Sequence, residues 1–133
     1  MYHGTSLVNA KQILTGGLDP HYTGAPRGVH ICVTENLELA RIFGEMTAWS
    51  QQDDIAVVLA MTLPNYRLMR RDTMYGAYTG PGYEWAGRAW RVKGQIPADQ
   101  LTVVAVSKRD EGLKYRRIGM KLEELMTLFH KSI

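Results

Sequence analysis

The chain has 133 residues, 45% of them hydrophobic, and its sixteen basic and thirteen acidic residues give a formal net charge of +3. This composition is typical of one globular domain with its own core, and it excludes a disordered chain. The mildly basic balance, with a pI near 9.1, allows a nucleic acid partner but does not require one. The single cysteine excludes an internal disulfide and provides no metal-ligand spacing, so we expect no metal. We find no signal peptide and no apolar run of about 18 residues, and we expect a cytoplasmic protein with no membrane partner.

The first predicted element is a short strand that runs into a helix. His3, Gly4 and Thr5 precede Ser6, which can cap a helix that Gly16 and Gly17 end. The N-terminus of this helix offers N–H groups and a positive dipole end that suit an anionic or polar ligand. The alternative is that His3 is a frayed terminal residue and that Thr5 and Ser6 only cap the helix.

A loop and a buried strand follow this helix. Residues 19–28 include two prolines, two glycines, Tyr22 and Arg27, which is typical of a loop that covers a ligand or of a plain surface connection. Residues 29–33 are mostly apolar and β-branched, and they predict a buried strand that contains His30. The imidazole of His30 is either a satisfied core group or a ring that stacks on a ligand in a cleft.

A helix and a central strand come next in the chain. Thr34 or Asn36 starts a helix that runs to about Ser50. Its predicted apolar face consists of Leu39, Ile42, Phe43 and Met46, with Trp49 near the end. Residues 55–63 are almost continuously apolar and predict a central strand that Pro64 ends.

The least regular segment covers residues 65–83, which contain three arginines, four tyrosines and three glycines. We expect an aromatic-lined loop whose arginines either meet phosphates or an acidic target or form a solvated basic face. Glu84 follows directly, where the loop enters a predicted strand over residues 88–92. A catalytic carboxylate is common at such a place, and a surface glutamate is the alternative. Residues 101–107 predict a further strand.

The last predicted element is a basic helix over residues 114–131. Apolar residues recur in it at helical spacing, and its basic residues are Lys114, Arg116, Arg117, Lys121 and Lys131. Such a helix packs on the sheet with a basic edge in solvent, or it binds a partner. The sequence shows no internal repeat, no glycine-rich dinucleotide motif, no P-loop and no zinc spacing.

Three of these segments together resemble the ADP-ribosyltransferase fold in its diphtheria-toxin and poly(ADP-ribose) polymerase branch. That branch opens with a His-Gly-Ser/Thr strand and a helix that ends in Gly-Leu, as residues 2–6 and 17–18 do here. Its second motif, Gly-Ile-Tyr-Phe-Ala, is similar to residues 28–32, and its third element is a glutamate that opens a later strand, for which Glu84 is the candidate. The resemblance extends to about Ser107. It implies an α+β fold with two packed small β-sheets flanked by helices in one domain over residues 1–133.

The resemblance also implies a mono-ADP-ribosyltransferase that cleaves NAD+ at the nicotinamide glycosidic bond and transfers ADP-ribose to a protein or nucleic acid acceptor. The implied catalytic residues are His3, His30 and Glu84. The residues implied in binding NAD+ as substrate are His3, Gly4, Thr5, Tyr22, Arg27 and His30. The implied acceptor-recognition loop contains Tyr75, Tyr78 and Tyr83.

Each implied contact has its own role. His3 would hydrogen-bond a ribose hydroxyl, the Gly4 backbone would hold the nicotinamide amide, and Thr5 would contact the adenosine side. His30 would stack on the nicotinamide ring. Glu84 would bind the 2′-hydroxyl of the nicotinamide ribose and stabilise the positive charge that develops on that sugar as the bond breaks.

One departure from the family pattern leaves alternatives open. His30 stands where the family has tyrosine, and a histidine there is similar to the RNA 2′-phosphotransferases, although those carry a further domain and basic motifs ahead of the first histidine. A non-catalytic module that binds NAD or ADP-ribose is the other alternative.

Residue 82 is glycine, where arginine-specific relatives carry Glu or Gln, so arginine is not the expected acceptor. Glu111 lies in a predicted turn and fits the catalytic glutamate poorly. A toxin, an anti-host factor and a housekeeping modifier are all compatible with the sequence.

Overall fold

The computed structural model describes residues 1–18, 30–62, 68–71, 89–93, 95–119, 124 and 127. In these ranges β1 and β2 are each followed by a helix, five further strands come after α2, and all strand pairs are antiparallel. The elements in chain order are β1 (Tyr2–Ser6), α1 (Leu7–Gly16), β2 (His30–Thr34), α2 (Leu37–Ser50), β3 (Ile55–Ala60), β4 (Leu68–Arg71), β5 (Ala89–Lys93), a 3-10 turn (Ala98–Gln100), β6 (Thr102–Arg109) and β7 (Tyr115–Ile118). The α+β class expected from the sequence is therefore confirmed.

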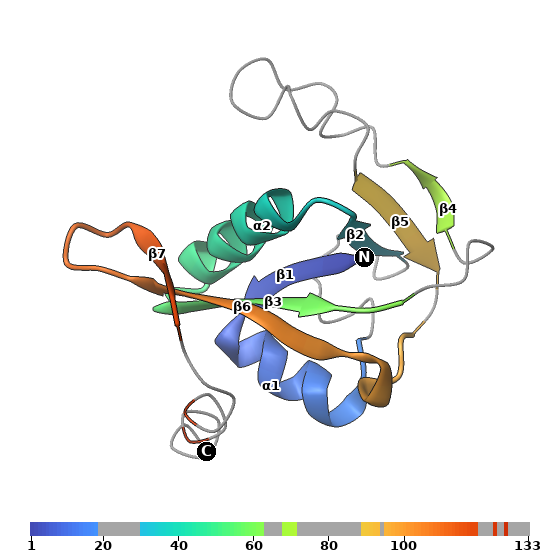
Figure 1. The fold of residues 1–133 in the computed structure, drawn as a ribbon, viewed down its shortest axis with the longest axis horizontal. Coiled ribbons are helices and arrows are strands. Elements are labelled where there is room, and N and C mark those ends of the chain that lie inside the picture. Colours follow the sequence, from blue (N-terminus) through green and yellow to red (C-terminus); the bar gives the residue numbers. More distant parts are fainter. Residues whose placement is uncertain are drawn as a thin grey trace.

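The strands form one sheet of seven in the order β4-β5-β2-β1-β3-β6-β7. The expected two packed sheets are not seen in the described part of the chain, because β1 and β2 join the two groups of strands. That joint is narrow, since β1 and β2 share one residue pair, Tyr2 with Thr34, whereas β1 and β3 share five. In Figure 1, β2, β5 and β4 accordingly lie apart from the group of β1, β3, β6 and β7.

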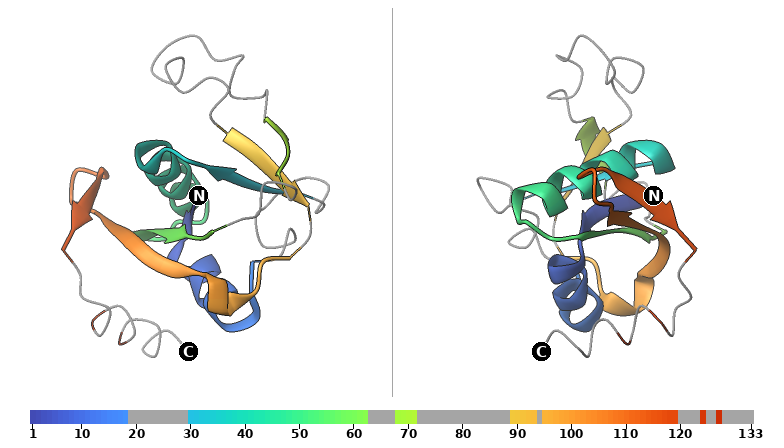
Figure 2. Two further views of the ribbon diagram at one scale, coloured as in Figure 1. Left: turned by 45° about the vertical axis from the view of Figure 1, so that its right-hand side comes forward. Right: turned by 90° about the vertical axis from the view of Figure 1, so that its left-hand side faces the viewer.

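The two helices cover opposite faces of the sheet (Figures 1 and 2). The α1 face holds the larger core, in which Ile13, Val57 and Leu59 are fully buried. The α2 face holds a smaller cluster of short side chains around Ala40 and Val58. The side chains of β3 alternate between these two cores, because successive residues of a strand point to opposite faces.

Local sequence signals account for the ends of both helices. The Ser6 hydroxyl accepts from Asn9 N at 3.1 Å, and the Asn36 side chain accepts from Leu39 N at 3.0 Å. Gly17 ends α1 with a φ of +93°, a conformation that favours glycine. Leu18 then returns to the core, where it and Ile96 are fully buried and exchange two backbone hydrogen bonds.

Three sequence predictions about these elements are wrong. Residues 115–118 form strand β7, which pairs with β6, and are not the first turn of a basic helix over residues 114–131. Further along the predicted helix, Glu124 and Thr127 are helical. Residues 68–71 form the edge strand β4 within the segment expected to be irregular. The expected apolar face of α2 is also misplaced, because Met46 is 59% exposed and Trp49 is 51% exposed.

The buried stripe of α2 consists mainly of short side chains: Leu39, Ala40, Gly44 and Ala48. Three of these recur every fourth residue, which places them on one line along the helix. Short side chains allow the helix axis to approach the sheet closely. This explains why α2 makes its most extensive contacts with β1. No helix in the described ranges has the length and apolarity needed to cross a membrane.

Candidate functional site

Three of the predicted site residues lie on β1, immediately beside the narrow joint with β2: His3, Gly4 and Thr5. His3 is 6% exposed and Thr5 is 1% exposed, so both side chains are buried and His3 is not a frayed terminal residue. They lie opposite Leu59 and Val57 of β3 and therefore on the α1 face of the sheet. Gly4 lies between them and faces α2.

The register fixes the direction of the Gly4 backbone. Met1 and Met61 exchange two backbone hydrogen bonds, of 3.0 and 2.9 Å, so this pair is of the hydrogen-bonded type. Hydrogen-bonded and non-hydrogen-bonded pairs alternate along an antiparallel ladder. Gly4, three residues further along and paired with Val58, therefore directs its N–H and C=O away from β3 and toward the β2 side. The ladder between β1 and β2 does not extend to Gly4, because Tyr2 with Thr34 is its one residue pair.

Gly4 is also the point of closest approach between β1 and α2. A Cβ atom at residue 4 would lie 1.8 Å from the carbonyl oxygen of Ala40 and 2.7 Å from the backbone N of Gly44. Both are backbone atoms of a helix and have no freedom to swing aside. The described structure thus requires glycine at this position for packing, independently of the ligand approach that the family resemblance implies.

His30 is the first residue of β2, and its backbone pairs with Lys93 of β5. It lies four residues from the joint at Thr34, about 13 Å along the strand, whereas Gly4 lies two residues, about 7 Å, from Tyr2. A ligand that contacts both Gly4 and His30 would have to span the difference between these two distances along the strands. The other predicted residues, namely Tyr22, Arg27, Tyr75, Tyr78, Tyr83 and Glu84, lie outside the described residues, as does the side chain of His30.

The N-terminus of α1 does not provide the anion site that its sequence suggests. The Asp53 carboxylate accepts from the backbone N of Val8 at 2.9 Å, and Ser6 accepts from that of Asn9. The turn before β3 therefore supplies the negative charge that complements the helix dipole. The same carboxylate accepts from Ile55 N at 3.1 Å, which ties the turn to the start of β3. At this helix end the Asp53 carboxylate therefore occupies the place that the sequence suggests for an anionic ligand.

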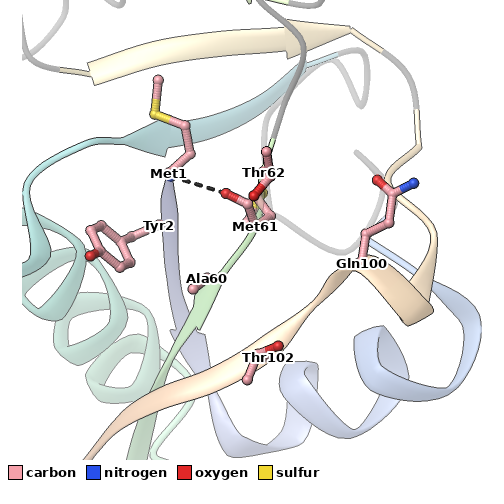
Figure 3. A pocket seen from close by; sticks show the side chains of 7 residues that line it. All are labelled: Met1, Tyr2, Ala60, Met61, Thr62, Gln100 and Thr102. Atoms are coloured by element: carbon pink, nitrogen blue, oxygen red, sulfur yellow. Dashed lines mark hydrogen bonds between the residues drawn. The ribbon is translucent and has the colours of Figure 1, made fainter.

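A shallow pocket of about 240 Å³ lies near the start of β1 (Figure 3). Its lining residues are Met1, Tyr2, Ala60, Met61, Thr62, Gln100 and Thr102. None of the residues predicted to bind NAD+ is among them, and none of these side chains is charged. The pocket adjoins the joint through Tyr2, but it offers no cationic side chain for a phosphate group.

Sequence reasoning missed a polar cluster between α2 and β6. Glu45 lies 3.5 Å from Arg41, which also forms an ion pair with Glu38, and it faces the buried Ser107 of β6. Burial raises the pKa of the Glu45 carboxyl above its ordinary value near 4.5, and Arg41 and Ser107 oppose this shift. The i, i+4 spacing of Arg41 and Glu45 is the one sequence signal that marks this cluster, and it indicates an ion pair and not a site.

The hairpin of β6 and β7 contains two further perturbed groups. A hydrogen bond from Arg116 at 2.6 Å lowers the pKa of the Asp110 carboxyl. Burial raises the pKa of the Tyr115 hydroxyl, which donates to the backbone oxygen of Asp53. In the described ranges, no group of three or more His, Cys, Asp or Glu side chains is arranged to hold a metal ion.

Comparisons with protein-family models, with curated proteins and with solved structures find no match to this chain.

Proposed function

We propose that this chain has the ADP-ribosyltransferase fold, that it cleaves NAD+ at the nicotinamide glycosidic bond, and that it transfers ADP-ribose to a protein or nucleic acid acceptor. The observation that carries the proposal is the backbone of Gly4. Its N–H and C=O point toward the β2 side at a place where the ladder between β1 and β2 does not continue.

A donor and an acceptor on one strand residue complement a primary carboxamide, which offers one acceptor and two donors. Nicotinamide carries such a group. A ligand held in this way extends the strand ladder with its amide, and the neighbouring buried His3 and Thr5 set the position of the strand. The direction of the Gly4 peptide groups supports this proposed contact with the carboxamide.

The chemical step breaks the bond between C1′ of the ribose and the nicotinamide nitrogen, and the electron pair of that bond leaves with neutral nicotinamide. Positive charge develops on the sugar ring, and a carboxylate beside it lowers the barrier. The acceptor nucleophile then forms a bond to C1′ and loses its proton to solvent. Glu84 is the residue proposed for the carboxylate, and His30 is proposed to stack on the nicotinamide ring, both from the sequence resemblance alone.

The test measures nicotinamide release from NAD+ by the purified protein, with and without cell lysate. Glu84→Gln should lower the rate about a hundred- to a thousandfold, because it removes the charge and keeps the size of the side chain. Glu111→Gln is the matched control, since Glu111 is exposed in the turn between β6 and β7 and should leave the rate unchanged. His3→Gln should also lower the rate. The midpoint of thermal unfolding of this variant shows whether the fold around the buried strand β1 is intact.

Three other outcomes would contradict the proposal. NAD+ binding without any release of nicotinamide, in every lysate fraction, would favour a non-catalytic module. Transfer of a phosphate from 2′-phosphorylated RNA would favour the RNA 2′-phosphotransferase activity. Equal rates in Glu84→Gln and Glu111→Gln would exclude Glu84 as the catalytic carboxylate.

A further inference from the structure

Basic residues outnumber acidic residues at the edge of the sheet formed by the β6–β7 hairpin. Residues 108–118 contain five basic and two acidic residues, a net charge of +3 that equals the formal charge of the whole chain. Two of the five cations are engaged, Arg109 with Asp54 and Arg116 with Asp110. The other three, Lys108, Lys114 and Arg117, are exposed and form no ion pair with the described residues.

The backbone of β7 presents a hydrogen-bonding edge beside these cations. Asp110 N donates to the oxygen of Lys114 at 2.8 Å, which makes this the first hydrogen-bonded pair of the hairpin. By alternation, Arg116 and Ile118 bond to β6, whereas Tyr115 and Arg117 direct their N–H and C=O groups outward. In the sheet order β7 has β6 as its one neighbour, so the outward side faces no further strand among the described residues (Figure 2).

The hairpin turn adds an exposed apolar side chain at the end of this edge. Leu113 is 57% exposed and has a φ of +62°, a conformation that side-chain-bearing residues rarely adopt. Gly112, which directly precedes Leu113, does not have a positive φ. The hairpin thus combines the outward peptide groups of β7, one exposed cation on β7 (Arg117), one on β6 (Lys108) and one in the turn (Lys114), with an apolar side chain at the tip.

Charged side chains on an edge strand protect it against pairing with a second copy, because two identical basic edges repel one another. The same positive charges favour pairing with a strand that carries negative charge. A nucleic acid would use the cations but has no need of the peptide groups of β7. We propose that β7 is a docking edge for an extended acidic segment of a partner protein, which adds to the sheet as an eighth strand. This proposal does not depend on the proposed enzymatic function.

The probe for this edge is a fluorescein-labelled peptide of about seven residues that alternates glutamate and valine, long enough to cover the four residues of β7. Fluorescence anisotropy should show binding that weakens as salt is raised. Arg117→Glu should weaken binding about tenfold or more, and Lys11→Glu, the same charge change on α1, should not. A peptide with lysine in place of glutamate should not bind.

A second comparison separates strand pairing from simple charge attraction. Arg117→Ala and Arg117→Pro both lose the guanidinium, but only proline also removes the outward N–H of residue 117. Proline is tolerated on an edge strand when its missing N–H would face solvent, so both variants should fold with similar unfolding midpoints. Arg117→Pro should bind the acidic peptide about three- to tenfold more weakly than Arg117→Ala, the effect of one hydrogen bond. A peptide methylated at alternate backbone nitrogens should lose binding.

Three results would overturn the proposal. Equal binding of the methylated and unmethylated peptides would show that no strand forms. Binding of a single-stranded DNA oligonucleotide that is equal in Arg117→Ala and Arg117→Pro, and that displaces the peptide, would assign the edge to nucleic acid. A dimer in sedimentation that Arg117→Glu abolishes would assign it to a second copy of the chain.

Discussion

Replacement of Gly4 by alanine tests the packing of α2 on β1. The added Cβ would lie 1.8 Å from the Ala40 carbonyl oxygen, whereas ordinary contact begins near 3.4 Å, so strand and helix would have to separate by about 1.6 Å. The obstacle is helix backbone, which cannot rotate out of the way. The separation would also loosen the buried stripe of Ala40, Gly44 and Ala48 along its length.

We expect Gly4→Ala to lower the free energy of unfolding by about 3 kcal/mol, the upper end of the usual cost of overpacking. For a domain of this size the thermal midpoint should fall by about 10 °C. Urea unfolding followed by circular dichroism measures both the midpoint and the slope, so that a change in stability is distinguished from a change in exposed surface.

Gly16→Ala is the matched control, because it makes the same chemical change at a place with no atom within 4 Å of the new Cβ. Gly16 is the last residue of α1, and alanine there should raise the free energy of unfolding by about 0.5–1 kcal/mol. A cost of less than about 1 kcal/mol for Gly4→Ala, or a change of stability in the same direction in both variants, would contradict the close packing of α2 on β1. The result also bears on function, because loss of activity in Gly4→Ala would not by itself indicate a lost ligand contact.

Three further predictions concern stability and use the same unfolding assay. Leu113→Gly should stabilise the protein by about 1 kcal/mol by removing the positive-φ strain, whereas Leu113→Ala should not, and a stabilising alanine would contradict the strain argument. Asp53→Ala should cost about 1–2 kcal/mol because two backbone N–H groups lose their acceptor, and Asp54→Ala, which removes an exposed ion pair, should cost less than about 1 kcal/mol. Burial raises the pKa of Glu45 in the folded state, so the folded protein holds this proton more tightly and stability falls as pH rises above about 4.5. Glu45→Gln should therefore be more stable than the natural chain at pH 7 and equal to it near pH 4, and a difference that grows toward low pH would contradict the assignment.

The sequence by itself determined α1, α2 and the central strand β3, because the signals for these are local. Ser6 and Asn36 cap their helices through side chains that bond residues three positions later. The apolar run at residues 55–60 forms β3, and Gly17 ends α1 where the chain must turn. The sequence also predicts β1 correctly as a strand before a helix, since this depends on the same local signals.

Only the tertiary structure decided which groups meet across the chain. Asp53 occupies the N-terminus of α1 although 45 residues separate it from Val8, and no local pattern encodes that contact. Residues 115–118 have a helix-compatible local sequence, but pairing with β6 satisfies the backbone groups of Arg116 and Ile118 and overrides that preference. The close approach of α2 at Gly4, and with it the direction of the Gly4 peptide groups, likewise depends on strand register and helix placement, which follow from packing the whole sheet and not from any single segment.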